Sequence, residues 1–306
     1  MKNSHRLMLS VILLSVSIAA VNAFGQMLPV GDPAPVPKAV AIARPTAEEI
    51  QLAKRSLDKF FETADPAMKE IHDKYPGLIA VVPPPPPPNT AIVPNLSAGF
   101  QKKHQDNVLV AKEGTSEVLF MGDSITDFWR NETGNYAGKQ VMDKYFGTWK
   151  IANFGIAGDT TQGVLFRLQN GEGQGFSPKA IMLMIGTNNT GRNTAAEIAE
   201  GVGAIVLEMQ KDFPKAQILL LGIFPRSTAK DPVRATLAEI NKIISKLDDG
   251  DRIHYLDIGA KFLDADGNIS KDVMSDALHP TAKGYEIWAE AVKEPLAKLV
   301  NATPEK

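Results

Sequence analysis

The sequence contains no cysteine among its 306 residues. This absence excludes disulfide bonds, a thiol nucleophile, thiolate metal sites and lipid attachment through an N-terminal cysteine. Stability must therefore come from packing, and a hydrophobic content of 44% is enough for a sizeable core in one large or two ordinary domains.

The chain also lacks an excess of positive charge, because 33 Lys and Arg stand against 35 Asp and Glu, a formal net charge of -2. No basic stripe offsets this balance, so we expect no nucleic acid partner. Three common catalytic motifs are missing too: Gly-x-Ser-x-Gly, His-Glu-x-x-His and the P-loop. Their absence argues against an α/β-hydrolase, a zinc protease and a nucleotide hydrolase.

Long apolar runs are confined to the first 26 residues, where Lys2 and Arg6 precede the stretch 7–21 and small residues follow up to Ala23. This pattern predicts a cleavable signal peptide over residues 1–26, and hence a secreted or periplasmic protein. The stretch is shorter than the ~20 residues of a membrane span, and no later segment approaches that length, so no integral membrane segment is expected after cleavage. An uncleaved anchor is the alternative.

Residues 27–96 form a proline-rich linker with a short helical extension in this interpretation. Five prolines among small residues predict disorder over 27–45. Thr46 and Glu49 have the spacing of a capping box that opens a helix, and a second short helix follows from Asp65. The six prolines of 83–88 must adopt polyproline II, as a stiff spacer or as a ligand for a proline-recognising partner.

Residues 97–306 alternate short apolar runs with amphipathic helices, as βαβ units do. The pattern predicts a three-layer α/β/α flavodoxin-like fold with a five-stranded parallel sheet. Expected strands are 117–121, 149–154, 180–185, 217–222 and 253–257. Expected helices are 97–111, 135–146, 160–170, 193–212, 231–248 and 281–299. Ligands of such sheets bind at the carboxyl ends of the strands.

Polar residues with catalytic potential follow several of these strands. Ser124 comes directly after the first strand, in Gly122-Asp123-Ser124, which would leave its hydroxyl exposed at the edge of the sheet. Serine there is also a common helix N-cap, so the tripeptide alone does not decide. Gly158 after the second strand and Asn188 after the third could donate hydrogen bonds to an oxyanion, although glycine and asparagine are also ordinary turn residues.

A carboxylate and an imidazole lie close together near the C-terminus, in Asp276-Ala277-Leu278-His279. These are the two partners that a serine needs for activation as a nucleophile. A lone histidine near a helix start is more often structural, but all these residues fall at one edge of the predicted sheet. Together they indicate a serine ester hydrolase.

The same residues resemble the four blocks of the SGNH (GDSL) hydrolase superfamily. The resemblance is greatest to the catalytic subunits of intracellular platelet-activating-factor acetylhydrolase and their bacterial relatives, and it covers roughly residues 115–299. It extends through 153–171, 186–189 and 221–226. Two departures, Asn189 for an aspartate and Pro280 after the histidine, do not change the assignment.

The resemblance implies a role for each matching residue. Ser124 would be the nucleophile, His279 the general base and Asp276 its orienting carboxylate. The oxyanion hole would comprise the backbone N–H groups of Ser124 and Gly158 and the side chain of Asn188. No metal or cofactor is implied, and a homodimer is among the expectations because close relatives dimerise.

Four apolar residues near the expected catalytic groups are candidates for the substrate-binding wall, although such residues are at least as often core. They are Ile125, Phe128, Trp129 and Leu278.

The expected function is hydrolysis of a short-chain, acetyl ester, of a small molecule or a carbohydrate, through an acyl-serine intermediate. The alternatives are a lipid or phospholipid esterase and a catalytically inactive binding module of the same fold.

Overall fold

The computed structural model describes residues 31–75 and 89–302 of the chain. Its centre is a five-stranded sheet with the order β2-β1-β3-β4-β5, in which every neighbouring pair is parallel. The strands are β1 (Val118–Gly122), β2 (Ile151–Asn153), β3 (Ala180–Met184), β4 (Gln217–Leu221) and β5 (Ile253–Leu256). The predicted strand number, direction and approximate positions are confirmed.

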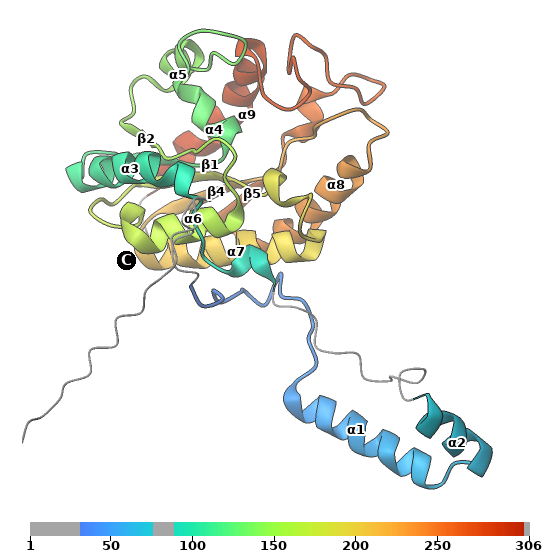
Figure 1. The fold of residues 1–306 in the computed structure, drawn as a ribbon. Coiled ribbons are helices and arrows are strands. Elements are labelled where there is room, and N and C mark those ends of the chain that lie inside the picture. The colour runs from blue at the N-terminus through green and yellow to red at the C-terminus, as the bar shows by residue number, and fades with distance from the viewer. Residues whose placement is uncertain (1–30, 76–88, 303–306) are drawn as a thin grey trace, which may run out of the picture.

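Helices cover both faces of this sheet (Figure 1). One layer contains α3 (Gln101–Glu113), α6 (Thr161–Arg167), α7 (Ala195–Asp212) and α8 (Pro232–Ile244), and the other contains α4 (Ser124–Asp127), α5 (Lys139–Phe146) and α9 (Ala282–Asn301). Residues of β1 alternate between the layers, since Leu119 and Met121 join one apolar core while Val118 and Phe120 join the other. The three-layer α/β fold is therefore confirmed.

The strand order determines where the chemistry can lie. Because β2 and β3 both pair with β1, the loops that follow these three strands leave the sheet side by side. Such a crevice at the carboxyl ends of parallel strands is the usual ligand site of an open α/β sheet.

The segment before the first helix is ordered where the sequence predicted disorder. The backbone N–H of Ala34 donates to the carbonyl of Ile92 at 2.8 Å, and both Ala34 and Val40 are buried. A β-carbon added at Gly203, in the middle of α7, would lie 2.6 Å from the Val40 side chain. The segment therefore packs directly against the backbone of α7, at a position where only glycine leaves room. The expectation of disorder is wrong for residues 31–44.

A buried carboxylate on α7 fastens the same segment. Glu200 accepts two hydrogen bonds of 2.7 Å from the guanidinium of Arg44, one of 2.8 Å from the N–H of Ile42 and one of 2.9 Å from Asn89. Burial alone would raise the pKa of Glu200, but these donors lower it overall. The carboxylate therefore stays ionised and holds together two segments that lie on either side of the helical extension.

The helical extension lies apart from the sheet (Figure 1). It consists of α1 (Ala47–Glu62) and α2 (Pro66–Lys74), and the predicted capping box of α1 is present, with Thr46 and Glu49 bonding reciprocally. Within the described residues, no helix is long and apolar enough to cross a membrane. The predicted signal peptide at 1–26 and the proline run 83–88 lie outside those residues.

Candidate active site

The end of β1 places Ser124 as the first residue of α4. A β-carbon at Gly122 would lie 2.3 Å from the hydroxyl oxygen of Thr126 and 2.4 Å from the carbonyl oxygen of Met184, so only glycine permits this tight exit from the strand. Asp123 caps α4 by accepting the N–H of Ile125 at 3.0 Å. Ser124 is more enclosed than the sequence suggested, since only 7% of its surface is exposed.

Three side chains form a hydrogen-bonded relay. The Oγ atom of Ser124 lies 2.9 Å from Nε2 of His279, and Nδ1 of the same ring lies 2.7 Å from Oδ2 of Asp276. The structure thus brings together residues separated by 155 positions in the sequence. This is the geometry in which an imidazole can take a proton from a serine hydroxyl.

The local conformation of the 276–279 turn keeps the carboxylate ionised. Burial alone would raise the pKa of Asp276, but hydrogen bonds from the backbone N–H and the ring of His279, from Tyr136 and from the N–H of Leu278 lower the pKa to about 2. An ionised carboxylate can only accept, so Nδ1 of His279 must carry the proton and Nε2 is left free to accept one from Ser124.

Two aromatic side chains complete the surroundings of the imidazole. The rings of Phe128 and Tyr136 lie with their centroids 5.0 and 5.1 Å from that of His279, and they stack on each other at 5.6 Å. The Tyr136 hydroxyl also donates to Oδ2 of Asp276 at 2.8 Å. Sequence reasoning missed Tyr136, because it lies in the irregular connection between α4 and α5, where no motif marks it.

The expected oxyanion donors follow β2 and β3, the strands on either side of β1. Gly158 has a φ of 87°, a conformation that favours glycine, and its N–H makes no hydrogen bond within the described residues. One hydrogen of the Asn188 side-chain amide is used at 2.8 Å on the carbonyl of Asp159. This bond fixes the amide plane of Asn188 directly against the loop that carries Gly158.

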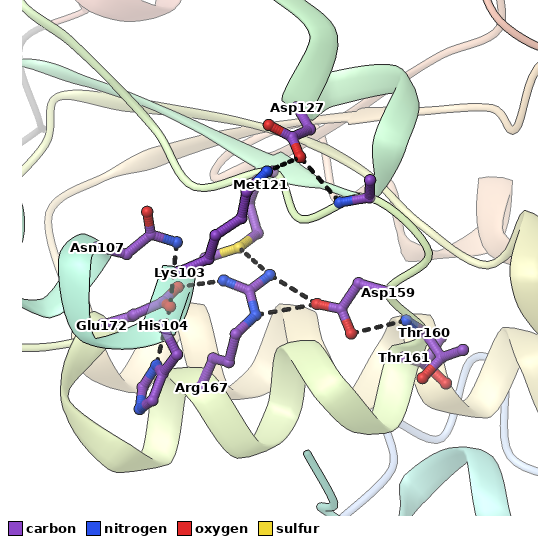
Figure 2. Close-up of polar contacts among 12 residues, drawn as sticks. Lys103, His104, Asn107, Met121, Asp127, Asp159, Thr160, Thr161, Arg167 and Glu172 are labelled. Carbon is purple, nitrogen blue, oxygen red and sulfur yellow. Dashed lines mark hydrogen bonds and ion pairs between the residues drawn. The ribbon is translucent and has the colours of Figure 1, made fainter. Parts of the chain in front are cut away.

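An ionic clamp joins α4, the helix that begins at Ser124, to the loop that carries Gly158, which we call the oxyanion loop. Asp127, on α4, accepts the N–H of Ala157 at 2.9 Å and is paired with Lys103 and Arg130 (Figure 2 shows the contact with Lys103). Arg130 in turn donates to the carbonyl of Gly155 at 2.8 Å. Burial would raise the pKa of Asp127, but the two cations lower it overall. The clamp therefore keeps Ser124 and Gly158 in a fixed relation.

A second, fully buried charge network lies behind the oxyanion loop (Figure 2). Arg167 donates through Nε to Asp159 at 2.9 Å and through Nη1 to Glu172, which also contacts His104 at 2.9 Å. Burial raises the pKa of Asp159 even though the Arg167 guanidinium and the Thr160 N–H favour its charged form. Because Asp159 directly follows Gly158 and its carbonyl holds Asn188, Arg167 positions the loop that carries Gly158 and against which Asn188 is fixed.

The four predicted wall residues divide into two pairs. Phe128 lies against His279, and Leu278 lines a cavity of about 370 Å³ together with Arg226 and other residues. Trp129, in contrast, is fully buried and packs against Tyr285 and Trp288 in the core. Ile125 is 1% exposed and belongs to the same core cluster. The prediction that Trp129 and Ile125 wall the substrate pocket is therefore wrong, because both side chains are buried in the core of the second layer.

Comparisons with known proteins identify the family of the chain. Residues 120–287 match the GDSL-like Lipase/Acylhydrolase family. The match spans more than half of the chain, and its limits lie close to the first strand and the last helix of the sheet domain. The chain therefore belongs to this family, within the SGNH hydrolase superfamily, and is an ester hydrolase.

Individual relatives support the same placement. The chain is 35% identical over 225 residues to platelet-activating factor acetylhydrolase IB subunit alpha2 of Rattus norvegicus, a match that covers 71% of this chain and 95% of the relative. The alpha1 subunit of Homo sapiens is 33% identical over 198 residues, covering 64% and 82% of the two chains.

Two solved structures share the fold. A protein of Streptococcus pneumonia has a TM-score of 0.52 at 23% identity, covering 65% of this chain and 94% of its own. A protein of Bacteroides fragilis NCTC 9343 has a TM-score of 0.54 at 19% identity, with coverage of 66% and 97%.

Proposed function

We propose that this protein is an exported serine esterase that removes a short acyl group, in particular acetyl, from a carbohydrate through an acyl-serine intermediate. The observation that carries the proposal is the relay from Ser124 through His279 to Asp276, with 2.9 and 2.7 Å between the successive polar atoms. The relay lies beside two loops that offer hydrogen-bond donors to an oxyanion.

Acylation begins when Oγ of Ser124 attacks the ester carbonyl and its proton passes to Nε2 of His279. Asp276 balances the imidazolium that forms. The carbonyl oxygen becomes negative and accepts bonds from the N–H groups of Ser124 and Gly158 and from the amide of Asn188. Each such donor contributes about 2.7–4 kcal/mol of transition-state stabilisation. The imidazolium then gives its proton to the departing alcohol oxygen.

Deacylation repeats these steps with water as the nucleophile. His279 takes a proton from the water molecule, the hydroxide attacks the acyl carbon, and the same donors hold the second oxyanion. Collapse of this intermediate breaks the bond to Oγ and returns the proton to Ser124. The carboxylic acid leaves, and the enzyme is restored.

Two observations support a short acyl group. The mammalian relatives are named acetylhydrolases. Bulky apolar side chains also lie close to the relay, with Phe128 against His279 and Leu278 in the wall of the cavity beside Asp276. The proposal of a carbohydrate follows from export, because an exported acetylesterase meets acetylated polysaccharides outside the cytoplasm. Export itself rests on the charged and apolar pattern of residues 1–26.

A series of nitrophenyl esters with acyl chains of two to twelve carbons tests the acyl preference. We expect kcat/KM to fall steeply with length, and a preference for long chains would overturn the acetyl assignment. Ser124→Ala should abolish turnover and labelling by a fluorophosphonate without changing the circular dichroism spectrum. Ser56→Ala, an exposed serine on α1, is the matched control. Wild-type protein that neither turns over esters nor labels would refute the proposed catalysis.

A phospholipid ester is the second candidate substrate, because the relatives act on platelet-activating factor according to their names. It is tested by comparing acetate release from an acetylated saccharide with acetate release from an acetylated glycerophosphocholine. Cell fractionation with N-terminal sequencing of the mature protein tests export, and a full-length cytoplasmic product would contradict it.

A further inference from the structure

A cavity of about 520 Å³ lies on the oxyanion side of the candidate active site. Its walls come from three parts of the chain that are distant in sequence. Ser97 and Phe100 belong to the segment before α3, Gly158 and Gln162 to the oxyanion loop and the start of α6, and Arg192 to the connection that follows Asn188. The cavity therefore opens beside Gly158, one of the three proposed oxyanion donors.

The contacts of this cavity show that it adjoins the reacting centre. A β-carbon at Gly158 would lie 3.5 Å from Cζ of Phe100, which means that the aromatic ring stands in van der Waals range of the oxyanion loop. The Gln162 side chain is held in place, because its Oε1 accepts a hydrogen bond of 2.9 Å from Asn189. A ligand in this cavity would thus touch a fixed wall adjacent to the bound ester.

The chemistry of the walls is mixed. Phe100 offers an apolar ring that is partly exposed, while Ser97, Thr160 and Gln162 offer hydroxyl and amide groups. Arg192 is exposed and forms no ion pair within the described part of the chain, so its guanidinium is available to donate. A sugar ring has an apolar C–H face and a rim of hydroxyl groups, which matches one aromatic face surrounded by donors and acceptors.

The size of the cavity excludes the acetyl group as its occupant. Sites for drug-sized ligands have volumes of roughly 300–1,000 Å³, and this cavity falls within that range. An acetyl group has only two carbons and would leave nearly all of the space empty. If the acyl group is short, the occupant must belong to the alcohol half of the ester.

We propose that this cavity is a subsite for a neutral oligosaccharide, with Phe100 stacking on a sugar ring and Arg192 donating to its hydroxyl groups. The proposal rests on the proposed function, because it assigns the alcohol half of the ester that Ser124 attacks. It makes Phe100 and Arg192 specificity-determining residues for that ester.

The first test compares two substrates that share the acetyl group. For Phe100→Ala and Arg192→Ala, we expect the ratio of kcat/KM on an acetylated xylo-oligosaccharide to kcat/KM on nitrophenyl acetate to fall about tenfold, as loss of one interface contact of ~1.4 kcal/mol would produce. Phe60→Ala and Arg55→Ala, exposed residues of α1, are the matched controls and should leave the ratio unchanged. An unchanged ratio in both cavity variants would overturn the subsite.

The second test does not depend on hydrolysis. Ser124→Ala protein is titrated with xylobiose, cellobiose and glycerophosphocholine, and binding is followed by calorimetry. We expect saturable binding of a disaccharide that is lost when Phe100→Ala is added. Binding of glycerophosphocholine alone would assign the cavity to a lipid headgroup and overturn the sugar assignment. If wild-type protein proves inert on all esters while disaccharide binding persists, the proposed function fails and the subsite stands.

Discussion

Replacement of Arg167 by methionine tests whether water is excluded from the buried charge network behind the oxyanion loop, as the structure indicates. The guanidinium, Asp159 and Glu172 all have fully buried side chains. Methionine retains most of the length of the side chain but removes every hydrogen bond that Arg167 donates to the two carboxylates. Removal of one partner from a buried ion pair typically costs about 3–5 kcal/mol, because the remaining charge is left uncompensated. That is a large part of the ~5–15 kcal/mol by which domains are stable.

The pH dependence of this loss has a definite sign. Burial already raises the pKa of Asp159, and without Arg167 its pKa must rise further. A carboxyl whose folded-state pKa is raised contributes stability that is fully present below its unfolded pKa and lost as the pH rises through its folded pKa. The penalty of Arg167→Met, relative to wild type, should therefore be larger at about pH 8 than at about pH 5.

The assay is urea unfolding followed by tryptophan fluorescence at these two pH values, with Arg55→Met on the exposed face of α1 as the control. Arg167→Lys, which keeps a positive charge, should fall between wild type and Arg167→Met. Where the methionine variant is still folded, kcat should fall more than KM rises, because the network positions Gly158 and Asn188. A loss below about 1 kcal/mol at both pH values would show that water reaches these carboxylates and would refute the reasoning.

Three further changes test separate parts of the structure. Asn188→Ala removes one oxyanion donor and should lower kcat by about 10²–10³-fold with little change in KM, measured by steady-state kinetics. Tyr136→Phe removes one donor to Asp276, and a net loss of about 0.5–1.5 kcal/mol predicts a roughly two- to tenfold fall in kcat. Arg44→Ala leaves Glu200 buried without its cation and should release the preceding segment to limited proteolysis, followed by mass spectrometry.

Matched controls separate these effects from general damage. Asn170→Ala changes an exposed asparagine and Tyr145→Phe a half-buried tyrosine, both away from the relay, and both should leave kcat unaltered. Arg55→Ala should leave the proteolysis pattern unaltered. A rise in KM alone for Asn188→Ala, or a protected N-terminal segment in Arg44→Ala, would contradict the roles assigned to those side chains.

The strands could be located from the sequence because short apolar runs mark them. The runs are longest in the central strands β1, β3 and β4, as expected for a parallel sheet that is covered on both faces. The catalytic candidates could be located because Ser124, Gly158 and Asn188 each follow one of these runs. A parallel sheet brings such positions to one edge whatever their separation in the chain. The strand order therefore places these residues, which are far apart in the sequence, around one crevice.

The substrate wall could not be divided correctly without knowing that a short helix follows Ser124. In helical geometry, residues four positions apart share a face, so Phe128 lies on the side of Ser124 while Trp129 lies on the side of Ile125. The first pair meets the imidazole, and the second pair meets the aromatic core. The short helix α4 was not predicted, and the three neighbouring apolar residues Ile125, Phe128 and Trp129 were therefore treated as one surface.

The sequence did not predict that residues 31–44 are ordered, because a proline-rich composition indicates only whether a segment can fold by itself, without contacts to the rest of the protein. The partner helix carried the missing signal, since Gly201 and Gly203 in the interior of α7 each cost about 1 kcal/mol relative to alanine. This loss of helix stability is expected to be offset by a close contact that only glycine allows. The structure supplies one at each position: Gly203 lies under Val40, and a β-carbon at Gly201 would come 2.9 Å from the carbonyl of Ala91. Two glycines on one helix thus indicate an external segment that the composition of that segment does not reveal.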